Sequence, residues 1–205
     1  MPPLQLDPTA AFLNIPYDKQ FEKLYLAYVA GITSFGLVPK ATLEIPGGVR
    51  RLDRISELIQ TCKYSFHDLS RVQVDRSKPR TPRFNMPFEL GLTIGLAKSK
   101  LGKDQIWFVF ETLNHRIQKS LSDLNGTDIY VHHGTVKGIF RELGNALVRS
   151  VGRPTVSEMT KVYNRLRKAL PEIMKRRGAT SAFQASVFHD LVFLAASLRK
   201  AVLKP

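Results

Sequence analysis

The chain has 205 residues, 43% of them hydrophobic and 23% charged, with a formal net charge of +14. These fractions are those of an ordinary globular protein. The single cysteine, Cys62, excludes an intramolecular disulfide and a zinc-ribbon architecture. No uninterrupted apolar run approaches the roughly 20 residues of a membrane-spanning helix, so we expect a cytoplasmic protein with no membrane partner.

The positive charge is unevenly distributed along the chain. Residues 1–152 hold 20 Lys/Arg and 14 Asp/Glu, a net of +6, whereas residues 153–205 hold 11 and 3, a net of +8. Such a basic segment is either a solvated helix surface or a contact for a polyanion or partner. If it has a role, we expect association, as a homo-oligomer, or anion contact rather than catalysis.

Strand-like and helix-like segments alternate over the first 150 residues. The apolar patterns predict strands at 10–15, 37–45, 64–67, 105–110 and 128–131. They predict helices between Asp18 and Gly36 and at 52–61, 86–98, 113–124 and 136–148. This alternation indicates an α/β fold, a three-layer flavodoxin-like arrangement with a parallel sheet of about five strands. Ligands bind such sheets at the carboxyl ends of the strands.

The pattern changes after Gly152-Arg153-Pro154, which reads as a break between an α/β domain at 1–152 and a basic helical hairpin at 153–205. Apolar residues at helical spacing predict one helix at 156–174 and a second at 183–202. Pro171 is expected to kink or end the first of them.

The most informative stretch surrounds Glu89. Asn85 suits a helix N-cap and Pro87 suits a first turn, so Glu89 is expected in the first or second turn of a helix. The helix dipole stabilises a carboxylate there. From spacing alone, Glu89 is either a capping-turn residue or a functional carboxylate.

The pattern Asn-x-x-Phe-Glu-Leu-Gly that begins at Asn85 resembles the motif of predicted nucleotide-binding proteins with TIR-like domains. It is also similar to the Glu-Leu-Gly helix of nucleoside 2-deoxyribosyltransferases. The segment 12–17 resembles the first strand and loop of that superfamily, and 66–70 resembles its strand that ends in an acidic residue. The resemblance covers roughly residues 10–150, and the order of the three motifs carries it.

The resemblance implies a site for ribosyl transfer. In it, Glu89 would attack the anomeric carbon of a nucleoside, or serve the cleavage of nicotinamide from NAD. Asp68 would hold ribose hydroxyls or a base edge, and Asn14 and Tyr17 would line the same sheet edge. The chain departs from the deoxyribosyltransferases before the Glu-Leu-Gly helix, where they carry an Asp and a Gly and this chain has substrate-binding candidates Arg83 and Asn85.

Arginines near these segments favour a phosphate-bearing ligand over a bare nucleoside. Arg71, Arg80 and Arg83 lie in or next to a polar loop at 70–84, and Arg50 and Arg51 follow a Pro-Gly-Gly turn at a helix start. The alternative is that these side chains are simply solvated.

Other combinations of reactive residues are weaker. His132 and His133 lack helix-spaced metal-ligand partners, so no metal site is expected. Ser65 and Ser70 lie near His67 in the sequence, but no G-x-S-x-G motif of a serine hydrolase is present.

Three hypotheses follow, in this order. The first is a nucleotide N-glycosidase that needs no cofactor and takes NAD or another nucleotide as substrate, with a role in bacterial defence signalling implied by the resemblance. The second is a non-catalytic TIR-like module that senses a nucleotide or self-assembles. The third, nucleic-acid binding, rests on charge alone and is not favoured, because no RNP-like pattern or helix-turn-helix is recognisable.

Overall fold

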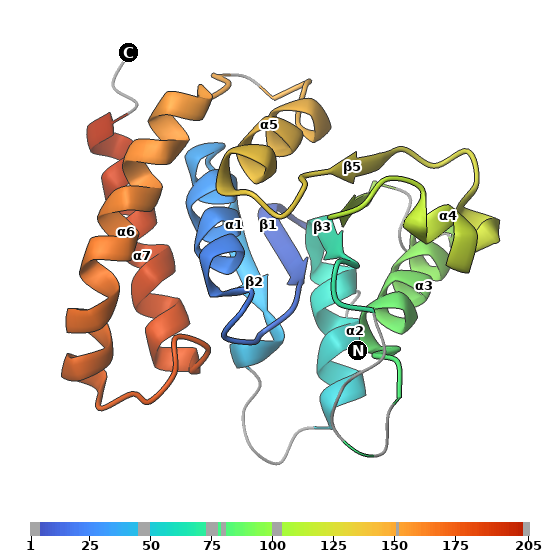
Figure 1. Ribbon diagram of the computed structural model, residues 1–205, viewed down its shortest axis with the longest axis horizontal. Coiled ribbons are helices and arrows are strands. Elements are labelled where there is room, and N and C mark those ends of the chain that lie inside the picture. Colours follow the sequence, from blue (N-terminus) through green and yellow to red (C-terminus); the bar gives the residue numbers. More distant parts are fainter. Residues whose placement is uncertain are drawn as a thin grey trace. The chain divides into compact units, whose positions relative to one another are not determined.

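A computed structural model describes residues 5–44, 50–72, 78, 81–99, 104–150 and 152–202 (Figure 1). The chain divides into two compact units. The first, here called the sheet unit, comprises Met1–Pro16, Lys40–Thr42 and Gly48–His133. The second, the helical unit, comprises Tyr17–Pro39, Leu43–Gly47 and Gly134–Pro205.

A five-stranded sheet has the order β2-β1-β3-β4-β5. Its strands are β1 (Asp7–Asn14), β2 (Val38–Ala41), β3 (Cys62–Asp68), β4 (Ile106–Glu111) and β5 (Ile129–Val131). The pairs β1–β3, β3–β4 and β4–β5 are parallel. This strand order is the flavodoxin-like one, so the predicted α/β fold class is confirmed. The strand expected at 37–45 is shorter than predicted, because a 3₁₀ turn at Thr42–Glu44 follows β2.

Two helices of the sheet unit, α2 (Arg51–Thr61) and α3 (Asn85–Lys98), pack on the sheet. Phe12 of β1 and Ile59 of α2 belong to one buried cluster, against which Leu92 of α3 packs. Met86 of α3 and Val109 of β4 belong to a second buried cluster. Full burial of such a side chain contributes about 1.5–3 kcal/mol, so these clusters fix α3 against the sheet face on which Phe12 and Val109 lie.

The sequence was misleading in two places of the sheet unit. The helix expected at 113–124 is instead a short helix α4 (Arg116–Ser120) followed by a 3₁₀ turn at Ser122–Leu124. His115 has a left-handed backbone with φ 60°, which no helical residue adopts, and Leu121 interrupts the helix at φ −131°. Asn85 is not an N-cap, because the helical backbone already begins at Phe84, whose carbonyl accepts the Phe88 N–H at 2.9 Å.

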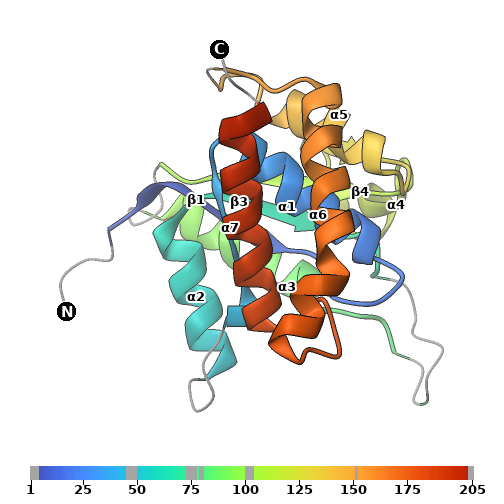
Figure 2. The same ribbon diagram turned by 90° about the vertical axis from the view of Figure 1, so that its left-hand side faces the viewer.

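The helical unit consists of α1 (Glu22–Ser34), α5 (Val136–Ala146), α6 (Val156–Arg177) and α7 (Ala185–Val202). Helix α1 contacts the other three, and α6 and α7 form the predicted antiparallel hairpin (Figure 2). A Cβ at Gly31 of α1 would lie only 2.5 Å from a methyl carbon of Leu143 in α5, so glycine permits this close helix approach. Within the described residues, no helix is both long enough and apolar enough to cross a membrane.

Helix α6 begins with a capping box. The Thr155 hydroxyl accepts the Glu158 N–H at 3.2 Å, and the Glu158 carboxylate accepts the Thr155 N–H at 2.7 Å. The helix runs through Pro171 to Arg177, so the expectation that Pro171 ends it is wrong. Pro171 is exposed, and the hydrogen bond that it removes is therefore lost on the solvent side. The chain leaves the helix at Gly178, with φ 59°.

Candidate functional site

The carboxyl ends of the strands in the sheet unit collect polar residues. Strands β1, β3 and β4 end at Asn14, Asp68 and Glu111, and His132 follows β5. Because the strands are parallel, these residues lie at one edge of the sheet. The buried Asp, Glu and His residues of the described chain all belong to the sheet unit: His67, Asp68, Glu89, Glu111 and His132.

Asp68 is fully buried and its carboxylate is engaged by the protein. One oxygen accepts the Ser70 N–H at 2.9 Å, and the other lies 3.1 Å from His132 Nε2. The Ser70 hydroxyl also lies 3.1 Å from that same nitrogen. Asp68 therefore joins the turn that follows β3 to the end of β5.

A serine, a histidine and an aspartate thus meet, but not as a catalytic triad. A triad places the carboxylate on Nδ1 of the histidine and leaves Nε2 to take the serine proton. Here Asp68 and the Ser70 hydroxyl share Nε2 of His132. The arrangement stabilises the turn and does not activate Ser70 as a nucleophile.

A second buried carboxylate, Glu111, is paired with Arg116. Arg116 Nε donates to Glu111 at 2.9 Å, and a terminal nitrogen of the same guanidinium donates to the Ser70 carbonyl at 2.8 Å. Burial raises the pKa of the Glu111 carboxyl, and the hydrogen bond from Arg116 opposes that rise. Arg116 therefore fixes the segment after β3 against the end of β4. The sequence pattern did not indicate this pair, although an acid that closes an apolar run is a signal for Glu111.

Asn14 attaches the first turn of α3 to the sheet. Its amide nitrogen lies 2.9 Å from both the Met86 carbonyl oxygen and Nδ1 of His67. An amide nitrogen only donates, so Nδ1 accepts and the proton of the ring is on Nε2. Burial lowers the pKa of His67 to about 3, which keeps the ring neutral. Within the described chain, Nε2 of His67 is a buried donor without a hydrogen-bond partner.

Glu89 lies one turn after Met86, on the buried face of α3 that also holds Leu90 and Thr93. The residue is only 6% exposed, and burial raises the pKa of its carboxyl to about 7. The charge of Arg51 opposes that rise. No described residue forms a hydrogen bond or an ion pair with the Glu89 carboxylate, unlike those of Asp68 and Glu111. Glu89 can therefore gain or lose a proton near neutral pH.

The structure brings some of the predicted site residues together. Asn14 and Asp68 end neighbouring strands, and Asn14 bonds to the helix that carries Asn85 and Glu89. Tyr17 belongs to the helical unit, where its ring packs 6.3 Å from that of Tyr25.

The predicted phosphate-binding arginines lie mainly at the surface. Arg50, Arg51 and Arg83 are exposed, and Arg71 is half-buried. Arg51 donates to the Thr42 hydroxyl at 3.2 Å. Arg80 and the Pro-Gly-Gly turn before Arg50 lie outside the described residues.

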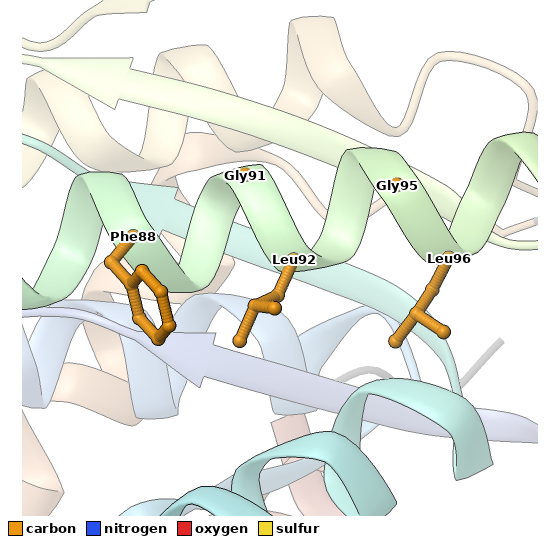
Figure 3. A pocket seen from close by; sticks show the side chains of 5 residues that line it. All are labelled: Phe88, Gly91, Leu92, Gly95 and Leu96. Atoms are coloured by element: carbon orange, nitrogen blue, oxygen red, sulfur yellow. The ribbon is translucent and has the colours of Figure 1, made fainter.

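An apolar groove of about 400 Å³ runs along α3 (Figure 3). It is lined by Phe88, Gly91, Leu92, Gly95 and Leu96. The exposed residues Phe88, Gly91 and Gly95 carry no polar side-chain group, so the groove offers no group for the chemistry of a nucleotide. Among the described residues, no three His, Cys, Asp or Glu side chains are grouped so that they could hold a metal ion.

The strand ends and the first turns of α3 thus bring together three buried carboxyl groups. Those of Asp68 and Glu111 are hydrogen-bonded to protein groups, and that of Glu89 has no hydrogen-bond partner among the described residues. Comparison of the chain with protein-family models, with curated proteins and with solved structures found no match.

Proposed function

We propose that the protein is a nucleotide N-glycosidase in which Glu89 acts on the bond between ribose and base. The observation that supports this most is the state of Glu89: it is buried, it has no hydrogen-bond partner among the described residues, and its pKa is raised to about 7. A carboxyl perturbed in this way, beside the carboxyl edge of a parallel sheet, is typical of a chemical site.

The proposed reaction breaks the bond between C1′ of ribose and the base nitrogen, and its electron pair leaves with the base. The ribosyl group then has the character of an oxocarbenium ion, which an ionised Glu89 stabilises or traps as an ester. Water adds at C1′ and gives the ribosyl product, which is ADP-ribose when the substrate is NAD, and one proton of that water passes to the solvent. NAD fits this chemistry because its nicotinamide leaves as a neutral base.

Other residues of the sheet unit have proposed supporting roles. Arg51, whose charge acts on Glu89, would contact phosphate together with Arg50, Arg71, Arg83 and Arg80. Asn14 and Asn85 would contribute to the substrate edge. A contact of Asp68 with ribose would have to replace one of its present partners, Ser70 N–H or His132, so we assign Asp68 first to holding the turn after β3.

The test is incubation of the purified protein with NAD and a panel of nucleotides, followed by chromatography for the released base. Glu89→Gln keeps the shape and removes the charge, and we expect base release to fall by at least about 100-fold, the scale of a lost acid–base or nucleophilic group. Glu172→Gln, an exposed substitution on α6, is the matched control and should retain activity. Equal activity in Glu89→Gln and wild type would refute the proposal.

The dependence on pH tests the same residue independently. If Glu89 acts as an ionised group, the rate with saturating substrate should rise with pH through about 7 and then level off. A rate that falls over this range would instead assign to Glu89 the role of a general acid.

A module that binds a nucleotide without cleaving it is the second candidate. It is favoured by Asp68 and Glu111, whose carboxylates already accept hydrogen bonds from protein groups. Saturable nucleotide binding without base release would favour it. In that case Glu89→Gln should change the affinity for nucleotide, with no base released by either protein.

A further inference from the structure

One side of helix α6 carries cations that the fold does not use. Lys161, Arg165, Lys168 and Lys175 are exposed and lie 4, 3 and 7 residues apart, a spacing that keeps them on the same side of a helix. The opposite side is the buried one, with Val162, Leu166 and Leu170 among other apolar residues. We name these four cations the α6 stripe.

Several other cations of the hairpin have partners. Arg176 and Arg177 bind Asp190 at 2.9 and 2.6 Å, and Arg199 donates to the Ser34 carbonyl. In contrast, no member of the α6 stripe forms a hydrogen bond or an ion pair with any described residue. The excess charge predicted for this part of the chain is therefore concentrated where it does not contribute to folding.

We propose that the α6 stripe binds the phosphate backbone of a nucleic acid, without reading its sequence. Lys161 and Lys175 are 14 residues apart, which is about 21 Å along the helix axis. One DNA strand presents a phosphate about every 3.4 Å of helix axis, so the stripe spans about six phosphates. Lysine and arginine in a row along one side of a helix suit such a linear polyanion, and their contacts position the backbone rather than recognise bases.

The same side of α6 fits an anionic membrane less well. A helix that lies in a membrane interface inserts large apolar side chains between its cations. None of the exposed large apolar residues of the described chain lies between Lys161 and Lys175, since Val156 precedes the stripe and Phe193 belongs to α7. Glu172 is the single acid within the stripe, and it should weaken any contact with phosphate.

The test uses the full chain and a fluorescently labelled DNA duplex of mixed sequence, with binding measured by anisotropy at several salt concentrations. If the four cations contact four phosphates, the logarithm of the binding constant should fall with the logarithm of the salt concentration at a slope of about −3.6. This slope corresponds to a loss of about 100-fold in affinity between 50 and 200 mM salt. Removal of three contacts in Lys161→Gln/Arg165→Gln/Lys168→Gln should lower affinity at least about tenfold and reduce the slope to about −1.

The matched control removes three exposed lysines elsewhere. Lys98→Gln/Lys119→Gln/Lys137→Gln has the same net charge as the stripe variant and should change affinity less than about threefold, because these lysines lie on other helices and are not part of the stripe that contacts phosphate. Equal losses in the two triple variants would overturn the proposal, as would binding to phosphatidylserine vesicles without binding to DNA.

A gain of affinity excludes misfolding as the explanation. Glu172→Gln should raise the affinity for the duplex about two- to fivefold at low salt, whereas Asp123→Asn, which changes the net charge equally from the exposed 3₁₀ turn after α4, should not. The absence of any difference between these two variants would refute a local role of the stripe. Loss of glycosidase activity leaves this binding intact, so the two proposals can fail separately.

Discussion

The two units differ in whether they bury ionisable side chains. The described part of the sheet unit buries two histidines and three carboxylic acids, whereas that of the helical unit buries no Asp, Glu or His. In the helical unit, the acids form surface pairs such as Asp190 with Arg177, and apolar and aromatic side chains fill the core. In its described part, the helical unit thus has a core held by apolar packing rather than by buried charges.

Burial of a charge is costly unless partners compensate for it. Asp68 and Glu111 have such partners, and both act on the segment that follows β3. Glu89 has no hydrogen-bond or ion-pair partner among the described residues, although the charge of Arg51 opposes the effect of its burial. Within the sheet unit, the comparison therefore separates carboxylates that hold the fold from Glu89, which has no such partner among the described residues.

The largest effect that we expect concerns Arg116. Arg116→Ala would leave Glu111 buried without its ion pair and the Ser70 carbonyl without its donor, so the free energy of unfolding should fall by about 3–5 kcal/mol. Chemical denaturation monitored by circular dichroism measures this loss. Adding Glu111→Gln should restore part of it, because the uncompensated charge is removed.

The counterpart in the helical unit is Arg177→Ala. Arg177 is exposed, and Asp190 keeps its bond from Arg176, so the midpoint of unfolding should barely change. A loss as large as that of Arg116→Ala would show that surface pairs matter as much as buried ones, and the contrast between the units would fail.

Glu89 should lower stability when it ionises. Its carboxyl has a pKa of about 7 in the folded chain and an ordinary value of 4.5. Between these values the unfolded chain has released the proton that the folded chain retains, so the free energy of unfolding falls as pH rises. At 1.36 kcal/mol per pH unit, the interval from 4.5 to 7 corresponds to at most about 3 kcal/mol.

Glu89→Gln should therefore stabilise the protein at pH 8 by about 2–3 kcal/mol and leave it unchanged below pH 4.5. Thermal unfolding at both pH values measures this difference. A stabilised but inactive variant would mean that the site costs stability for its chemistry. A variant destabilised at pH 8 would show that the Glu89 carboxylate has a favourable partner after all.

Local patterns sufficed for much of the fold. The apolar run at 105–110 predicted β4, because a buried parallel strand is nearly continuously apolar. The short segment at 64–67, which ends at the acid Asp68, predicted β3. Local patterns failed at His115, because its left-handed backbone does not change the spacing of apolar residues around it.

The candidate site was predictable only in part. Asn14, Asp68 and Glu89 followed from their positions at strand ends and a helix start. The bond from Asn14 to Met86 joins residues 72 positions apart, and that from Arg116 to Ser70 spans 46, so no local pattern contains them. Such distant partners decide whether a carboxylate is hydrogen-bonded, as that of Asp68 is, or lacks a partner in the described part of the chain, as that of Glu89 does.

The smallest expected effects compare how a helix begins in each unit. Helix α6 has a capping box, in which the Thr155 hydroxyl accepts the Glu158 N–H, so Thr155→Ala should lower the free energy of unfolding by about 1 kcal/mol.

Helix α3 begins without a side-chain cap, and Asn85 is an exposed residue of its first turn. Asn85→Ala should therefore leave stability unchanged or raise it by a few tenths of a kcal/mol, because alanine is the better helix former. Urea denaturation of Thr155→Ala and Asn85→Ala measures both changes in the free energy of unfolding. A loss of about 1 kcal/mol in Asn85→Ala would mean that its side chain caps α3 after all. With stability unchanged, any loss of nucleotide binding in Asn85→Ala would be attributable to the site itself, since the helix that carries Glu89 would be intact.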